Sequence, residues 1–225
     1  MRSWSDDHPK AKLMAQKRAL ILNAAREAFL GAGFEGASME AIAAAAGVSI
    51  MTLYRHARTK DDLFEAVVSE ACAPVAGSEE HQAIQAILQR PLTEILAFVG
   101  VRFQERLGEP QALGLLRAVM IEHRHFPHLS QLAYEGLVAS HARQLAEFLA
   151  ERPEAAGLGD ERCAKLSDRF VDRLLGTDLL KALLGISVSI RGEWESRARQ
   201  AASALIVELE QVSADLRHRR GRRVR

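Results

Sequence analysis

The sequence predicts an all-α protein in which a small N-terminal three-helix domain is joined to a larger C-terminal helical domain. Apolar residues recur at the three- and four-residue spacing of an amphipathic helix in nearly every segment. No segment alternates apolar and polar residues as a half-buried strand does. The composition changes near residues 60–77, from short Ala-rich segments to longer Leu-rich ones. We therefore expect domains at residues 12–60 and 61–216, followed by a basic tail at 217–225.

The N-terminal helices are marked by glycines and by capping residues. Apolar residues at i, i+1, i+4, i+7 and i+8 predict a helix over residues 21–29, which Gly31 and Gly33 end. Ser38 is placed to cap a second helix over residues 39–46, because its hydroxyl can accept a hydrogen bond from a free N–H of the first turn.

The later helices are longer and their apolar faces are wider. Thr59 is expected to cap a helix over residues 60–74, and ERPEAAGLGD at 151–160 is expected to be a loop. The segment 161–184 is apolar over more than one face, so it needs partners on two sides. Apolar stripes predict the remaining helices over residues 92–107, 113–120, 129–150, 161–184 and 194–216.

Composition restricts the class of protein and its compartment. The 225 residues have a formal net charge of +1, and no run of about 18 apolar residues predicts a membrane span. The polar N-terminus does not resemble a secretory signal. Cys72 and Cys163 share no motif spacing, which excludes a disulfide framework and a cysteine zinc site. We expect a cytoplasmic protein without a metal or other cofactor.

Charge is distributed unevenly along the chain. Residues 1–60 contain nine Lys or Arg against five Asp or Glu, which hints at a polyanionic partner for this part. The last nine residues, RHRRGRRVR, add six arginines. These arginines could bind phosphate, although a solvated, disordered terminus is the more frequent explanation of such a block.

The stretch AAAAGVSIMTLYRHARTK at 43–60 predicts two short helices joined by a tight turn. Gly47 can adopt the left-handed conformation that ends the first helix, and Ser49 can cap the second from residue 50. Two short helices joined in this way form a helix-turn-helix. Leu53 and Ala57 lie four residues apart and face inward on the second helix.

The other positions of the second helix point outward and suit the major groove of DNA. Thr52 can hydrogen-bond base edges or contact a thymine methyl, and Arg55 can reach guanine or a phosphate. Tyr54, His56 and Lys60 can bond phosphate oxygens, which position a helix without reading sequence. The candidate DNA-binding residues are Ser38, Ser49, Ile50, Met51, Thr52, Tyr54, Arg55, His56 and Lys60.

The segment GASMEAIAAAAGVSIMTLYRHARTKDDLFEAVV resembles the DNA-binding signature of the tetracycline-repressor-like (TetR) family of bacterial transcription regulators. The resemblance covers roughly residues 14–70. LLRAVMIEHRHFPHLSQLAYEGL and RFVDRLLGTDLLKALLG are similar to the C-terminal regions of some AcrR-like members. The matching N-terminal elements keep the family's mutual spacing: Ala45-Ala46-Gly47-Val48-Ser49, Thr52-Leu53-Tyr54, His56, Lys60, Leu63 and Phe64.

This sequence departs from the family pattern at two places. The family usually has an aromatic residue where this chain has Ala57, so a neighbour must fill the volume. The family often has polar or small residues where this chain has Ile50 and Met51. These apolar side chains cannot donate to phosphate, and we expect them to pack on thymine methyls of an A·T-rich site.

The resemblance implies a sequence-specific transcriptional regulator, most simply a ligand-responsive repressor that binds a palindromic operator as a homodimer. The two subunits would pair through the helices 161–184 and 194–216, and a small apolar effector would enter the C-terminal domain. The charged candidates matter for ligand binding only if they are buried. The candidate ligand-binding residues are Phe98, Arg102, Arg117, Met120, His123, Tyr134 and Asp178.

Other classes of function have weaker support in the sequence. His123, His125 and His128 form a tempting metal cluster, but the first two do not share a helix face and Phe126-Pro127 breaks the backbone. No GxSxG, HExxH, P-loop or GxGxxG motif supports an enzyme. A helical interaction module without DNA affinity stays open, and its binding would lack the steep salt dependence of phosphate contacts.

Overall fold

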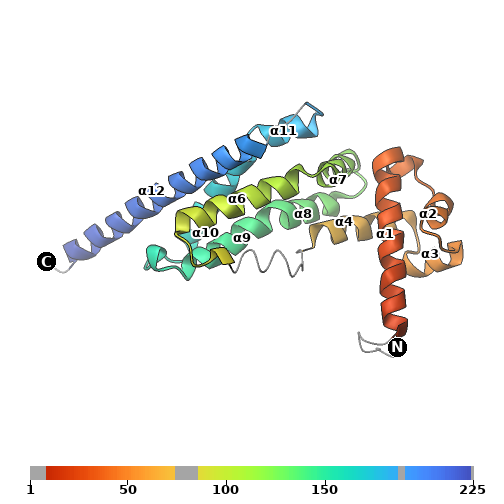
Figure 1. The fold of residues 1–225 in the computed structure, drawn as a ribbon, viewed down its shortest axis with the longest axis horizontal. Helices are drawn as coiled ribbons and strands as arrows, with labels where there is room; N and C mark the ends of the chain where they lie inside the picture. Colours follow the sequence, from red (N-terminus) through yellow and green to blue (C-terminus); the bar gives the residue numbers. More distant parts are fainter. Residues whose placement is uncertain (1–8, 74–85, 187–190, 224–225) are drawn as a thin grey trace. The chain divides into compact units, whose positions relative to one another are not determined.

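The computed structural model describes residues 9–73, 86–186 and 191–223, and the regular structure within these ranges is helical throughout (Figure 1). The predicted all-α class is therefore confirmed. The α-helices are α1 (Pro9–Gly36), α2 (Met39–Ala45), α3 (Ile50–His56), α4 (Lys60–Cys72), α6 (Leu92–Gly108), α7 (Pro110–Ile121), α8 (Pro127–Tyr134), α9 (Ser140–Ala150), α10 (Asp160–Leu175), α11 (Asp178–Leu183) and α12 (Arg191–Arg223). None of these helices combines the length and apolarity needed to cross a membrane.

The described chain packs into two compact units. The first contains residues 9–73 and 114–133, and the second contains 86–113, 134–186 and 191–223. The chain passes from one unit to the other within α7 and again at the end of α8. The boundary expected between residues 60 and 61 stays a prediction.

The first unit is built around α1, which packs against α2 and α4 (Figure 1). Its centre is an aromatic cluster of Phe29, Phe34, Phe64 and Phe126, in which the Phe29 and Phe64 rings meet edge to face at 5.1 Å. Such pairs stabilise a core beyond their area burial. This cluster ties α1 and α4 to the residue that precedes α8, and so holds the frame on which α2 and α3 rest.

The predicted start and stop signals of the N-terminal helices are largely confirmed. The Ser38 hydroxyl accepts from the Ala41 N–H, and Thr59 forms a capping box with Asp62 at the start of α4. Gly33 has a φ of 74° and breaks α1, but Gly31 stays helical and one further turn continues to Gly36. The helical hydrogen bonds therefore resume after the kink.

The second unit is a bundle in which α12 packs on α6 and α10, and α10 packs on α9. The contact between α6 and α12 is close because Gly100 has no side chain. A Cβ at Gly100 would lie 3.1 Å from the Ala198 Cβ and 3.1 Å from Leu174 Cδ2. The core of this unit also contains Leu96, Phe170 and Leu205, all of which are fully buried.

The prediction of a single helix over 161–184 is wrong. Gly176 adopts a φ of 51°, which ends α10 at Leu175, and α11 begins at Asp178. The prediction that this segment is apolar all round is wrong for α10 as well. One face of α10 buries apolar residues such as Leu166 and Phe170, while the opposite face exposes charged residues such as Asp168.

Two other predicted segments have different limits in the structure. The helix expected over 129–150 starts at Pro127, and its middle is the π-helical segment η1 (Glu135–Ala139). The last helix extends beyond both ends of the predicted range 194–216. Because α12 continues to Arg223, the backbone of the basic tail is helical over residues 217–223.

Candidate DNA-binding and ligand-binding sites

The helix-turn-helix is formed by α2, a short turn and α3. Gly47 has a φ of 64°, and its N–H donates to the Ala44 carbonyl, so the chain turns within two residues of the end of α2. The Ser49 hydroxyl then accepts from the Thr52 N–H at 3.2 Å and caps α3. Sequence spacing alone predicted both of these features.

The inward face of α3 fixes the helix against α2. Leu53 is 0% exposed and Ala57 is buried directly after the last turn of α3. Ile42 of α2 is also fully buried, and Ala46 is buried at the end of α2. Ala57 is therefore buried, although it is smaller than the aromatic residue that is usual at this position.

The outward face of α3 exposes side chains that can contact bases and phosphates in a major groove. Met51 is 71% exposed, Tyr54 is 43% exposed, and Arg55 is exposed beside them. Thr52 and Ile50 are half-buried at the edges of this face. The Thr52 hydroxyl lies 2.9 Å from the Ser49 hydroxyl, within hydrogen-bond distance. The methyl group of Thr52 takes no part in this hydrogen bond.

Lys60 has a structural partner that the sequence did not reveal. Its Nζ donates to the backbone carbonyls of Glu35 at 3.2 Å and Ala37 at 3.3 Å, where α1 ends. It also lies 4.6 Å from the centre of the Phe34 ring, a cation–π contact. An ammonium group has three donors, so two carbonyl contacts leave one donor for a further acceptor.

The N-terminal part of α1 contributes cations to the neighbourhood of α3. Burial lowers the pKa of His56 below its ordinary value of 6.5, and the positive charges of Arg18, Arg55 and Lys17 lower that pKa further. His56 is therefore neutral near pH 7. Sequence reasoning missed Lys17 and Arg18 as members of this surface, and only the excess of Lys and Arg in residues 1–60 pointed to them.

A second candidate site lies in the second unit, where α6, α10, α11 and α12 meet. There the chain leaves a hollow of about 350 Å³, including space open to solvent, which we call the Gln104 hollow. Its walls include Phe103, Gln104, Leu174, Asp178, Leu179 and Trp194.

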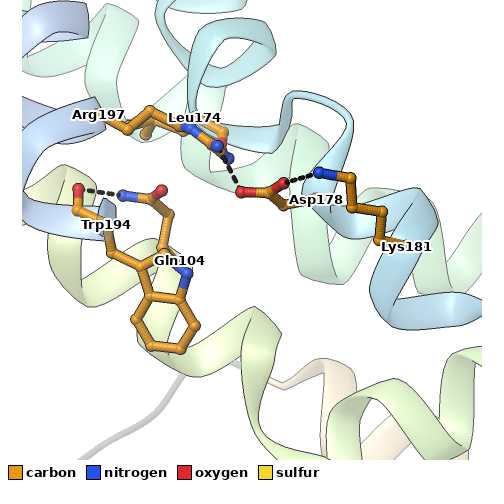
Figure 2. Close-up of polar contacts among 6 residues, drawn as sticks. All are labelled: Gln104, Leu174, Asp178, Lys181, Trp194 and Arg197. Atoms are coloured by element: carbon orange, nitrogen blue, oxygen red, sulfur yellow. Dashed lines mark hydrogen bonds and ion pairs between the residues drawn. The ribbon is translucent and has the colours of Figure 1, made fainter. Parts of the chain in front are cut away.

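Gln104 links two walls of this hollow. It is only 6% exposed, and its Nε2 donates to the carbonyls of Gly100 at 3.1 Å and Trp194 at 3.0 Å. Two carbonyl partners fix the amide orientation, because a flipped side chain would place its oxygen against both. Figure 2 shows the Gln104 Oε1 directed away from the Trp194 carbonyl, and this buried oxygen has no hydrogen-bond partner within the described structure.

The charged groups at the hollow neutralise one another. Asp178 is 8% exposed and pairs with Arg197, while Lys181 Nζ lies 3.3 Å from its other oxygen (Figure 2). Arg197 also donates to the Leu174 carbonyl at 3.4 Å. Position 176 accepts no side chain easily, because a Cβ on Gly176 would lie 3.2 Å from Arg197 Nη1.

The predicted ligand-binding residues differ in how far they are buried. Asp178 lines the Gln104 hollow and is buried, which is the condition set above for a charged ligand-binding residue. Arg102 and Arg117 are exposed and do not meet this condition. Met120 and Tyr134 are also more than half exposed. Phe98 is half-buried, and His123 is exposed with its Nδ1 2.9 Å from the Met120 carbonyl oxygen. Ligand roles for the seven residues stay predictions.

His125 and His128, the other two histidines of the candidate metal cluster, face acidic residues of α4. His128 Nε2 lies 2.9 Å from Glu65 Oε1, and His125 Nε2 lies 3.9 Å from Asp61 Oδ2. No group of three or more potential ligands among the described residues is arranged to hold a metal ion.

The architecture and the helix-turn-helix match one family over most of the chain. The sequence model of the bacterial regulatory proteins of the tetR family matches residues 21–67. That of the C-terminal domain of AefR-like transcriptional repressors matches residues 94–207, which is more than half of the chain. The chain belongs to the TetR family. It is a DNA-binding transcriptional repressor and not an enzyme. Proteins of this family bind DNA and dimerise, and responsiveness to a ligand is typical of them.

Individual relatives of this TetR-family repressor agree with the assignment. The transcriptional regulator UidR of Escherichia coli strain K12 is 28% identical over 196 residues, covering 83% of this chain and 87% of UidR. The structure of the flavonoid-responsive regulator FrrA is similar, with a TM-score of 0.63 and 26% identity over 86% of this chain and 96% of FrrA. A TetR-family regulator from Mesorhizobium loti has the same fold, with a TM-score of 0.71 and 24% identity over 86% of this chain and 96% of that one.

Proposed function

We propose that this repressor reads a palindromic operator as a homodimer, with one α3 helix in each of two major grooves. The observation that carries the proposal is the outward face of α3, where Met51, Tyr54 and Arg55 are exposed on a helix anchored by the buried Leu53. The two grooves would lie one or a few helical turns apart, near multiples of about 34 Å.

Each residue of this face has a distinct proposed role. Thr52 and Arg55 contact base edges, whereas Tyr54, His56 and Lys60 bind phosphates. Ile50 and Met51 pack on thymine methyls, which favours A·T pairs beneath them. Ser38 and Ser49 lie at the N-termini of α2 and α3, where N–H groups attract phosphate. A preferred operator with G·C pairs under Ile50 and Met51 would contradict their proposed role.

The cations of α1 extend the phosphate-binding surface. Lys17 and Arg18 are close enough to His56 to lower its pKa, so they flank the end of α3. A phosphate beside this group would relieve the repulsion among the cations. We include Lys17 and Arg18 in the proposed interface as backbone contacts without sequence preference.

The proposed dimer interface uses the helices that follow residue 160. α10 exposes a charged face and α12 exposes Val207 along its middle, so the contact combines ionic and apolar groups. A ligand in the C-terminal domain then acts by favouring one separation of the two α3 helices over another. The name of FrrA makes flavonoids the first ligands to test, and a repressor that acts on bacterial DNA works in the cytoplasm.

Selection of bound DNA from a random library, at two salt concentrations, tests the proposal. Recovery of a palindrome, with an affinity that falls steeply as salt rises, is the expected result. The Tyr54→Phe protein keeps the ring but loses the phenolic donor, and it should weaken binding equally on all sequences. Binding with no preferred sequence would refute operator reading by α3 and leave only a basic surface.

A further inference from the structure

We propose that the π-helical segment η1 (Glu135–Ala139) is a hinge, at which the helical run from α8 through α9 changes its bend when the repressor binds or releases operator DNA. The inference names a moving part of the protein, which the family assignment and the proposed reading of DNA by α3 do not specify. It rests on the proposed function only for the response to DNA, because the hinge itself is a property of the free protein.

The first observation is the place of η1 in the chain. α8, η1 and α9 follow one another without a break, and the residues that flank η1, Tyr134 and Ser140, have α-helical φ and ψ. The boundary between the two compact units falls between Ala133 and Tyr134, one residue before η1 begins. At the other described crossing, between Leu113 and Gly114, α7 is α-helical throughout. The irregular turn therefore lies where one helical run passes from one unit to the next.

The hydrogen bonds of η1 differ from those of the α-helices on either side. The Ser140 N–H donates to the Glu135 carbonyl, five residues back, instead of the Gly136 carbonyl, four residues back. The Ser140 hydroxyl donates to the Gly136 carbonyl at 2.9 Å, and so uses the acceptor that an α-helix would pair with the N–H. Such π-helical turns are rare, occur mostly at functional sites and are one of the few causes of a sharp bend in a helix. The run is therefore expected to bend most easily at η1.

The extra residue of η1 also determines which side of the run is buried. Before it, the buried residues Ala133 and Leu137 are four apart, and after it Ala142 and Leu145 are three apart, as on one face of an α-helix. Across η1 the step from Leu137 to Ala142 is five residues. A continuous α-helix would instead turn His141 toward the buried side. A change in the geometry of η1 therefore alters the orientation of α8 relative to α9.

Each half of the run is anchored within its own unit. On the α8 side, His128 Nε2 lies 2.9 Å from Glu65 Oε1 of α4, and Phe126 belongs to the aromatic cluster described above. On the α9 side, the helix packs on α10, and the His141 ring meets the Phe103 ring of α6 edge to face at 5.0 Å. Because packed segments move as bodies, a change in the bend is taken up by the residues between these anchors.

Hydrogen exchange of single amides in the full chain without DNA tests the hinge itself. The amide of Ser140 reports on η1, and the amide of Leu145, a buried residue of α9, reports on the regular helix beside it. We expect the protection factor of Ser140 to be at least roughly tenfold lower, because a turn that bends opens its hydrogen bonds more often. Equal protection of the two amides would overturn the proposal, because η1 would then be as rigid as α9.

Ser140→Ala and Ser203→Ala form a matched pair of variants. The first removes the hydroxyl that donates to Gly136, whereas the second removes a hydroxyl from an exposed position of α12 and accounts for the higher helix propensity of alanine. We expect Ser140→Ala to lower the protection factor at position 140 by roughly twofold to tenfold, the change that one net hydrogen bond produces. Ser203→Ala should leave it unchanged. An equal effect of the two variants would show that exchange at position 140 does not report on the π-helical turn, and would overturn the assignment of the hinge to η1.

Operator DNA connects the hinge to the function. When the operator recovered by library selection is added, we expect the protection factor of Ser140 to change by about fivefold or more, the lower limit of a typical coupling between sites, while that of Leu145 stays the same. A Ser140 amide that exchanges identically with and without bound operator would overturn the proposal, even if α3 reads that operator. Failure to recover any operator would instead refute the proposed function, and the measurements on the free protein would still decide whether η1 opens locally.

Discussion

Replacing Lys60 with Met tests whether one side chain serves both the fold and the DNA. Lys60→Met keeps most of the aliphatic stem but removes the ammonium group that bonds the Glu35 and Ala37 carbonyls and lies over Phe34. Both hydrogen bonds exceed 3.1 Å, near the long end of the normal range, and Lys60 is only half-buried. We therefore expect a loss of about 1–2 kcal/mol of unfolding free energy rather than the full sum for charged contacts.

Thermal unfolding and the salt dependence of operator binding measure the two roles separately. For a chain of this length, the expected loss lowers the melting temperature by roughly 2–8 °C. One lost phosphate contact lowers the slope of log K against log salt by about 0.9 per subunit. Arg143→Met removes one positive charge from an exposed pair with Glu135 and should change neither quantity. An unchanged melting temperature would refute the structural role, and an unchanged slope would refute the phosphate contact.

Three other substitutions in and around α3 have distinct expected outcomes. Arg55→Ala should relax the base preference at one operator position by about 1–3 kcal/mol, measured by repeating the library selection, and equal weakening on all sequences would assign Arg55 to the backbone. His56 has a pKa below 6.5 in the free protein, and a nearby phosphate raises it, so binding takes up a proton and tightens as pH falls from about 7 to 6. His56→Gln should remove that pH dependence in a titration of operator affinity, whereas a dependence that persists would exclude His56 as its source. Ser49→Ala removes the cap of α3 and should cost about 1 kcal/mol in chemical denaturation, and a cost near zero would show that water replaces the cap.

The N-terminal unit was predictable because short-range signals determine its helices. Ser38, Ser49 and Thr59 each accept from the N–H group three residues further along the chain, and Gly47 needs only its own φ. The break at Gly176 was not predictable in the same way. The leucines at 174–175, 179–180 and 183–184 continue a helical spacing across it, and the side chain that lies beside Gly176 is Arg197, from a helix further along the chain.

In the candidate sites too, features set by neighbouring residues were predictable and features set by distant residues were not. The outward face of α3 follows from helical geometry, since positions that flank a buried Leu53 must point away from α2. The partners of Lys60 and the neutral state of His56 depend on the ends of α1, more than 20 residues away, which spacing within the motif does not reveal. Gln104 left one signal that was overlooked, because it interrupts an otherwise apolar stripe between Phe103 and Leu107.

The capping box at Thr59 makes the junction between α3 and α4 a stiff joint. The Asp62 carboxylate accepts from the N–H groups of Arg58 and Thr59, so the few residues between the two helices have no freedom to bend independently. The 13 residues of α4 extend about 20 Å at 1.5 Å per residue. A tilt of α4 by about 5° would therefore move its far end by roughly 1.7 Å. Because the junction is stiff, α3 would rotate together with α4.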